Sequence, residues 1–207
     1  FPAFVSLLYR EQTGIWFVVT AGLLFLLALS IGRKPKDTVI YAKEGFVIVA
    51  MAWILWSAFG ALPFVLSGAI PNYIDAFFET VSGFTTTGST ILKDIEALPK
   101  GINFWRCQTH WIGGMGVLVF VMAIIPLSGK GSMFLMRAEV PGPTCDKLVP
   151  KTRATAKILY SMYLLLSALE VFFLLLGGMD LYNAVIHTFS TAGTGGFGIR
   201  NDSIAGY

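Results

Sequence analysis

The sequence GFTTTGST, residues 83–90, contains four threonines, one serine and two glycines but no acid, base or histidine. It lies between two long apolar runs. A polar but uncharged segment in this setting either remains outside a bilayer or folds back into it. The composition of the chain, the neighbouring segments and an internal repeat all bear on this choice.

The chain as a whole has the composition of an integral membrane protein. Of its 207 residues, 55% are hydrophobic and only 13% are charged, with a mean hydropathy of +0.71. This apolar fraction exceeds that of soluble domains. The net charge of +3 does not indicate a nucleic-acid ligand, because Lys and Arg gather in the cytoplasmic loops of membrane proteins whatever their function. We therefore expect a lipid bilayer, and no nucleic acid, as a partner.

Apolar segments of two lengths predict an all-α integral membrane protein. A spanning helix needs about 20 mostly apolar residues. Four stretches reach this length: 14–32, 45–68, 104–127 and 155–178. Two further segments, 72–82 and 180–190, are half-apolar and too short to cross. Their length is typical of re-entrant or interfacial helices.

The distribution of basic residues predicts the orientation of these spans. Lys and Arg concentrate in short cytoplasmic connections. Two links are basic: the first carries Arg33, Lys34, Lys36 and Lys43, and the second carries Lys130, Arg137, Lys147, Lys151 and Arg153. With both links in the cytoplasm, each short segment must enter and leave the membrane on the outer side. Residue 1 then lies outside, so we expect an earlier span before it. Cys107 is external and Cys145 cytosolic, which excludes a disulfide between them.

An internal repeat links the two short segments. A shift of 108 residues aligns DAFFETVSGFTTTGST, residues 75–90, with NAVIHTFSTAGTGGFG, residues 183–198. The identical pairs are Ala76 and Ala184, Thr80 and Thr188, Ser82 and Ser190, Thr86 and Thr194, and Gly88 and Gly196. The order of apolar span, short helix and Thr/Gly-rich loop is also repeated. Repeats of this kind are typical of membrane transport proteins, and the equal orientation suggests copies around an axis along the membrane normal.

The loop composition is suited to a cation inside the membrane. Asn72 and Asp180 are placed to cap the N-termini of the short helices, whose C-termini then point towards mid-membrane and favour a cation there. The following loop returns in a non-helical form, which is tolerated at that depth only if it is buried in protein or lines a cavity. Glycine permits carbonyls to be turned to one side, and carbonyl oxygens can replace the hydration shell of potassium.

These segments resemble the Trk/Ktr/HKT superfamily of potassium transporters, most closely its bacterial TrkH branch. The resemblance rests on four motifs: FFETVSGFTTTGST at 77–90, HWIGGMGV at 110–117, RAEVPGP at 137–143 and STAGTGGFG at 190–198. It implies tandem M1-pore helix-M2 repeats of potassium-channel type around a pseudo-four-fold pore. Family members carry four such repeats, each contributing one filter glycine. By position these correspond to Gly88 and, by the 108-residue register, to Gly196.

The resemblance also implies which residues form the filter. The first wall consists of Thr85, Thr86, Thr87, Gly88 and Ser89, and the second of Gly193, Thr194, Gly195, Gly196 and Phe197. The potassium ligands are expected at Thr86, Thr87, Gly88, Thr194, Gly195 and Gly196. Glycine rather than serine in the first filter resembles the potassium-selective members, although sodium permeation stays open, as does the choice between a channel and a coupled symporter.

The expected organisation has four parts. Residues 1–44 form the end of an N-terminal helical hairpin and a cytoplasmic link, 45–127 the first repeat, 128–154 a second link and 155–207 a truncated second repeat. Two walls of a four-walled pore are not expected to conduct alone. The resemblance implies a homodimer in a bacterial inner membrane, with a cytosolic nucleotide-binding regulatory subunit of the TrkA type. No cofactor is expected, because the chain has neither a P-loop nor a dinucleotide-binding motif.

Two other classes of function are less consistent with the sequence than ion transport. An intramembrane enzyme would need a nucleophile with a base, and neither a GxSxG-type elbow nor paired aspartates in spanning helices are present. A non-conducting structural or receptor-like bundle accounts for the spans but leaves both Thr/Gly-rich loops unexplained.

Several polar or small residues outside the two loops also have an expected role. Glu79 is expected to brace the filter from behind rather than to face the outer mouth, and for Asp75 both roles stay open. His110 is more typical of packing than of a proton relay or metal ligand. Glu170 is a functional candidate because it is an acid inside a span, or it pairs with another helix. The glycines of HWIGGMGV are expected to permit close helix approach rather than to widen the pore below the filter; they are Gly113, Gly114 and Gly116.

Overall fold

The computed structural model describes residues 1–32, 42–116 and 152–205, and all regular secondary structure in these ranges is helical. The helices are α1 (Pro2–Leu8), α2 (Gly14–Ile31), α3 (Ala42–Gly60), α4 (Leu62–Leu66), α5 (Tyr73–Phe84), α6 (Lys100–Gly114), α9 (Thr152–Leu176) and α10 (Leu181–Ala192). The all-α prediction therefore holds for the described chain.

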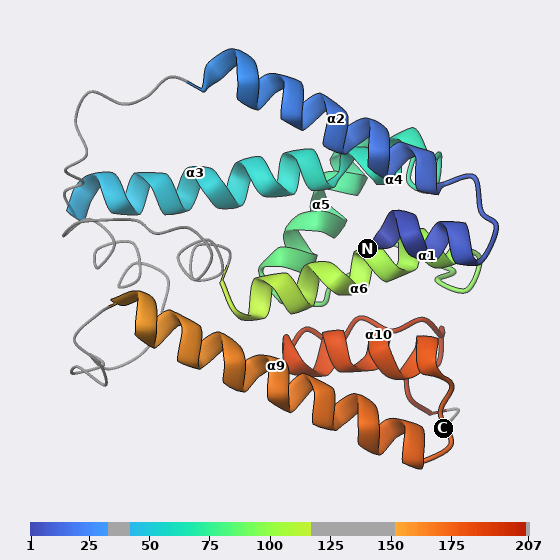
Figure 1. Ribbon diagram of the computed structural model, residues 1–207. Helices are drawn as coiled ribbons and strands as arrows, with labels where there is room; N and C mark the ends of the chain where they lie inside the picture. The colour runs from blue at the N-terminus through green and yellow to red at the C-terminus, as the bar shows by residue number, and fades with distance from the viewer. Residues whose placement is uncertain (33–41, 117–151, 206–207) are drawn as a thin grey trace.

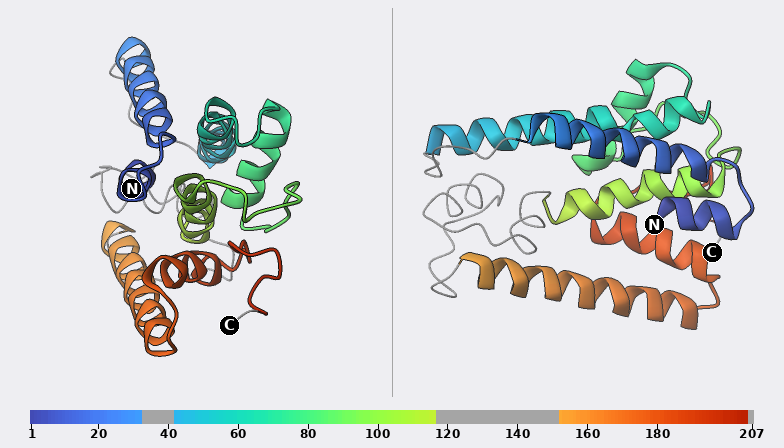
Figure 2. Two further views of the ribbon diagram at one scale, coloured as in Figure 1. Left: turned by 90° about the vertical axis from the view of Figure 1, so that its right-hand side faces the viewer. Right: turned by 45° about the horizontal axis from the view of Figure 1, so that its top comes forward.

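Helix α6 lies at the centre of the arrangement (Figures 1 and 2). It packs against both short helices, α5 and α10, and against α1. The long helices lie further out, with α3 against α5 and α9 against α10. The two short helices thus share one central helix, which is the arrangement that brings the loops after them together.

Both short helices begin at one end of the bundle and run towards its middle (Figure 1). The chain after each of them returns to the end from which the helix started, so each helix and its loop form a hairpin (Figure 1). The last residues of α2 and the first residues of α3 and α9, which flank the two basic links, lie at the opposite end (Figure 1). This hairpin shape agrees with the prediction that each short segment enters and leaves on one side.

The outer helices present their apolar side chains outward. Two helical stretches in the described residues are long and apolar enough to cross a membrane, Phe46–Leu66 and Ala156–Leu176. In the second, only 6% of the apolar window is buried, so it is not the core helix of a soluble protein. Large exposed side chains such as Leu165, Leu166 and Phe173 need an apolar surrounding instead. Helix α2 is also apolar, though shorter, and it matches the predicted segment 14–32 closely.

The predicted span 45–68 is interrupted in the structure. Helix α3 ends at Gly60, and α4 begins at Leu62 with Pro63 in its first turn. Proline lacks the amide proton for the bond to the preceding turn, and its ring displaces the carbonyl four residues back. The interruption places the Phe64 side chain in a buried cluster with Ile70 and Ile102, which anchors the start of the first hairpin on α6.

The predicted span 104–127 is wrong as a continuous apolar helix. Helix α6 begins at Lys100, four residues earlier than expected, and ends at Gly114. Its early start depends on Glu11, whose carboxylate accepts hydrogen bonds from the amides of Lys100 (2.7 Å) and Gly101 (2.9 Å). Such a cap from a distant segment satisfies amides that the helix leaves free. Helix α6 can contain many buried polar residues because it packs against other helices of the protein and not against lipid.

The close approach predicted for the three glycines of HWIGGMGV is confirmed for two of them. A Cβ atom at Gly113 would overlap the Phe84 carbonyl oxygen, and one at Gly114 would meet the backbone of Gly193. Each glycine therefore lets α6 touch the end of one short helix. Gly116 differs, because it follows the helix end with a positive φ of 73° and turns the chain instead.

Some sequence predictions fall on residues that the structure does not describe. These are most of the two basic links, the stretch 117–127 of the third predicted span, the RAEVPGP motif and Cys145. Cys107 is described and buried.

Candidate ion filter

The two short helices are built alike. Helix α5 has Asn72 as N-cap, with its side-chain oxygen accepting from the amide of Ile74 at 3.0 Å. Helix α10 has Asp180 as N-cap, accepting from the amide of Asn183 at 3.2 Å. Both caps confirm the sequence prediction. The helices end at Phe84 and Ala192, positions that the 108-residue shift also aligns.

The loops after these helices share their backbone geometry. Positive φ angles occur at Thr86 (54°) and Gly88 (76°) in the first loop, and at Thr194 (59°) and Gly196 (84°) in the second. Each loop also makes the same turn: the Thr87 amide donates to the Ser82 carbonyl, as the Gly195 amide does to that of Ser190, both at 2.9 Å. The repeat predicted from the alignment therefore extends to backbone conformation.

A positive φ is unusual for threonine. A β-branched residue in this region is a conformational outlier, and such strain costs of order 1–3 kcal/mol per residue. Placing every second residue of a short segment in the left-handed region turns successive carbonyls towards the same side, an arrangement that glycine permits most readily. The Thr-x-Gly pattern of both loops thus produces a backbone that can present several oxygens to one ligand.

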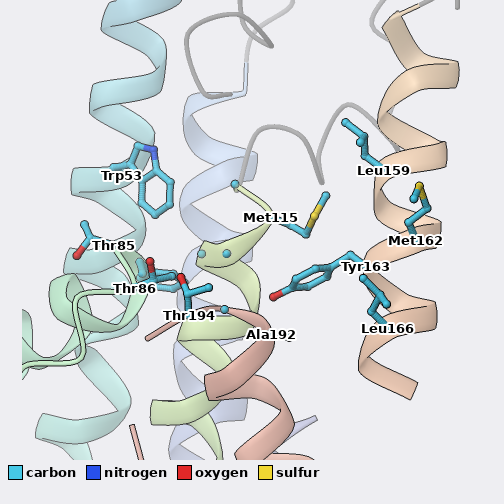
Figure 3. A pocket seen from close by; sticks show the side chains of 15 residues that line it. Trp53, Thr85, Thr86, Met115, Leu159, Met162, Tyr163, Leu166, Ala192 and Thr194 are labelled. Carbon is cyan, nitrogen blue, oxygen red and sulfur yellow. The ribbon is translucent and has the colours of Figure 1, made fainter. Parts of the chain in front are cut away.

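Both helix ends open onto a common cavity of about 730 Å³. Thr85 and Thr86 line it from the first hairpin, and Gly193 and Thr194 line it from the second. Figure 3 shows Tyr163 of α9 pointing into the same space. The last carbonyls of a helix carry about half a negative charge. Two helices therefore direct negative potential towards this cavity, and no Asp or Glu is among its described lining residues.

The two loops approach each other closely at Gly88. A Cβ atom at Gly88 would overlap the carbonyl oxygen of Gly195, whereas a Cβ atom at Gly196 would have no atom within 4 Å. Although both glycines have positive φ angles, only Gly88 is also enclosed by the neighbouring wall. The two glycines therefore occupy equivalent positions in the sequence repeat but have different surroundings in the structure.

The predicted filter residues differ in where they face. Thr85, Thr87, Ser89, Thr194 and Gly196 are exposed, Thr86, Gly88 and Gly195 are half-buried, and Gly193 and Phe197 are buried. The outer ends of both loops are attached to the protein behind them. The Ser89 carbonyl accepts a hydrogen bond from the Ser82 hydroxyl at 2.6 Å. The ring of Phe197 stacks on His110, with the ring centroids 4.0 Å apart, so its side chain points away from the loop surface.

Glu79 braces the first loop, as predicted. Its carboxylate accepts hydrogen bonds from the Thr90 hydroxyl at 2.8 Å and from the Ile91 amide at 3.1 Å. It also forms an ion pair with Arg106 of α6, with the Nε to Oε1 distance at 2.6 Å. Both side chains are fully buried. Arg106 was not among the predicted site residues, although a basic residue inside a predicted span is a signal of function or pairing.

Arg106 reaches the second loop from the same position. Its Nη1 donates to the Gly198 carbonyl at 3.0 Å, and its guanidinium lies 3.7 Å from the centroid of the Phe197 ring. One buried side chain of α6 therefore contacts both hairpins. His110, one turn along α6, is fully buried as well, and its contact with Phe197 supports the packing interpretation.

Helix α9 is attached to this core through polar contacts. The Trp111 indole donates to the Ser167 hydroxyl at 3.1 Å, and the Tyr163 hydroxyl donates to the Trp111 carbonyl at the same distance. Glu170 interacts with Thr191 of α10. This interaction places Glu170 beside the second hairpin and assigns it no transport role.

The outer ends of the hairpins are joined by a second set of contacts around Asn201. Its side-chain oxygen accepts from the Ile95 amide at 2.8 Å, and its side-chain nitrogen donates to Asp94 at 2.9 Å. Its own amide donates to Glu96 at 3.1 Å. The hydrogen bond from Asn201 lowers the pKa of Asp94 below its ordinary value, because it stabilises the charged carboxylate.

We expect the substitution Asn201→Ala to raise the pKa of Asp94 towards its ordinary value. A carboxyl group with a lowered pKa stabilises the folded state above its ordinary pKa, and this contribution is lost as the pH falls through the lowered value. Carbon-13 NMR of labelled Asp side chains, with Asp94→Asn to assign the signal, measures the shift. The substitution Ile204→Ala, at an exposed position of the same loop, is the control. An unchanged titration in Asn201→Ala would show that the bond does not form.

Apolar outer helices around two paired helix-loop hairpins are typical of a helical membrane protein. The comparison with known families agrees with this class: the model described as TrkH, cation transport protein, matches residues 15–207. The chain belongs to the TrkH family.

Individual relatives support the same assignment. The Trk system potassium uptake protein TrkH of Escherichia coli K12 is 43% identical over 98% of this chain, and TrkG of the same organism is 37% identical over 98%. The crystal structure of the potassium transporter TrkH from Vibrio parahaemolyticus superposes on the whole chain with a TM-score of 0.77 at 36% identity. This chain spans 43% of the length of both E. coli relatives and 42% of the V. parahaemolyticus chain.

Proposed function

We propose that this chain contributes to potassium uptake across the cell membrane, as the ion-translocating subunit of a Trk-type system. The observation that carries the proposal is the pair of hairpins with matching backbone geometry, whose helix C-termini face a common cavity. Relatives named as potassium uptake proteins supply the identity of the ion. Potassium is the cargo of this site and not a resident cofactor.

The proposed ligands are backbone carbonyl oxygens of the two loops, at Thr86, Thr87, Gly88, Thr194, Gly195 and Gly196. Carbonyl dipoles replace the water that a potassium ion loses on entry. An uncharged filter suits transport, because an ion must be held well enough to enter and weakly enough to leave. The two loops form two of the four walls of a pseudo-four-fold pore built from M1-pore helix-M2 repeats. Two further loops of the same kind form the other two walls.

Membership of the TrkH family supports a proposal on the wider setting of the chain. We propose a multi-pass protein of a bacterial inner membrane that forms a homodimer and binds a cytosolic nucleotide-binding subunit of the TrkA type. The basic links are the natural contact for such a partner, and they also satisfy the positive-inside rule. A cation channel of mixed potassium and sodium selectivity is the second candidate, because the same carbonyl ligands bind both ions.

Growth of a potassium-uptake-deficient bacterium tests the proposal. The natural full-length chain is expected to restore growth at limiting potassium. The substitutions Gly88→Ser and Gly196→Ser are expected to lower the preference for potassium over sodium, because each changes the backbone at a proposed ligand. If neither substitution alters growth or ion preference in protein present at normal amounts, the two loops are not the filter.

A further inference from the structure

We propose that Arg106 is a positioning residue for ion selectivity, which holds the outer ends of both loops at a set separation through its ion pair with Glu79. The proposal rests on the proposed function of the loops as a filter. It adds a residue that is not in either loop and does not contact the ion.

The first half of this connection runs through Glu79. The carboxylate binds the Thr90 hydroxyl and the Ile91 amide immediately after the first loop. It belongs to α5, which precedes the same loop. Glu79 therefore closes the first hairpin on itself, so the loop cannot lengthen or shift outward without breaking one of these bonds.

The second half runs through Arg106. Its Nε donates to Glu79 at 2.6 Å while its Nη1 donates to the Gly198 carbonyl at 3.0 Å. Gly198 follows the second loop directly, and the guanidinium also covers the Phe197 ring. Two donors on one rigid, planar group thus join residues that are 119 positions apart in sequence, from Glu79 to Gly198.

The chemistry of the pair requires arginine. Burying a charge is tolerated only when its partner and additional hydrogen bonds replace the lost water, and here both side chains are fully buried with several bonds each. Arginine presents donors in a fixed fork, whereas the lysine ammonium is a single point of charge on a flexible stem. A lysine at this position keeps the charge but cannot hold Glu79 and Gly198 in the same geometry.

A merely structural ion pair and a positioning residue predict different measurements. If the pair only stabilises the fold, a folded variant transports with unchanged ion preference. If the pair sets the separation of the loops, a folded variant loses preference while its maximal potassium uptake changes little. In enzymes, misplacement of a reacting group by about 1 Å can cost about 10²-fold in rate, and we expect ion preference to depend on the loop separation in a similar way.

The test is the substitution Arg106→Lys in the natural full-length chain, expressed in a potassium-uptake-deficient strain. Potassium and sodium uptake are measured per molecule of protein in the membrane. We expect the potassium-over-sodium preference to fall by about tenfold, with maximal potassium uptake within about twofold of the parent. Arg200→Lys is the matched control, because Arg200 forms its ion pair with Asp202 at the exposed rim.

A milder variant keeps the test decisive if Arg106→Lys does not accumulate. Thr90→Val removes one hydrogen bond to Glu79 at an exposed position and is expected to shift the preference in the same direction by a smaller factor. Unchanged preference in both Arg106→Lys and Thr90→Val, while Gly88→Ser does alter it, overturns the positioning role and leaves the filter intact. Unchanged preference in the glycine variants as well overturns both proposals.

Discussion

The substitution Gly88→Ala is expected to be far more damaging than Gly196→Ala, although the two glycines occupy equivalent positions of the repeat. An L-residue in the left-handed region costs roughly 1–2 kcal/mol, and both positions carry this cost. At Gly88 the new methyl group would also overlap the Gly195 carbonyl oxygen, whereas at Gly196 it enters open space. Forced overlap in packed surroundings adds about 1–3 kcal/mol.

Thermal unfolding of the purified protein in detergent measures this difference. We expect a clearly larger fall in Tm for Gly88→Ala than for Gly196→Ala, accompanied by a larger loss of potassium uptake. Gly22→Ala provides the control for a glycine whose Cβ would have no atom within 4 Å and whose φ is not positive. Equal effects at Gly88 and Gly196 would mean that the two loops do not touch at Gly88.

The second large effect is expected from separating Glu79 and Arg106. The substitution Glu79→Gln leaves a buried guanidinium without its counter-charge, and Arg106→Gln leaves a buried carboxylate. Removing one partner of a buried ion pair typically costs 3–5 kcal/mol. We therefore expect either single variant to unfold at a much lower temperature or to fail to accumulate in the membrane.

The double variant, Glu79→Gln with Arg106→Gln, distinguishes this explanation from simple loss of packing. Two neutral amides avoid an unpaired buried charge, so the double variant is expected to be more stable than either single variant. Comparing all four proteins by thermal unfolding and by membrane yield gives the coupling between the two residues. Additive losses in the double variant would contradict a direct pair.

Much of the architecture was predictable because its signals are local. The half-apolar segments 72–82 and 180–190 were too short to span, and their caps, Asn72 and Asp180, satisfy amides only two or three residues away. The glycines of the two loops were likewise expected to turn carbonyls to one side, since Gly88 and Gly196 accept the left-handed conformation readily. Each of these features depends on neighbours in the chain. The positive φ angles of Thr86 and Thr194 were not predicted.

The errors came where distant segments decide the outcome. Hydropathy predicted one helix over 104–127, but α6 begins at Lys100 because Glu11, 89 positions away, caps its first amides. The central position of α6 was not predicted either, because hydropathy does not reveal that α5 and α10 pack against its polar side chains. Arg106 was missed for the same reason, since both of its partners lie on other elements.

The sequence by itself determined the two hairpins, their 108-residue register and the membrane character of the chain, because capping, chain reversal and hydropathy act over a few residues. Only the tertiary structure decided that a side chain at Gly88 would meet the second loop whereas one at Gly196 would not, and that Glu79 and Arg106 connect the two hairpins. The physical reason is that steric overlap and buried charge pairing depend on which elements pack together. Two identical glycines therefore acquire different roles from their surroundings.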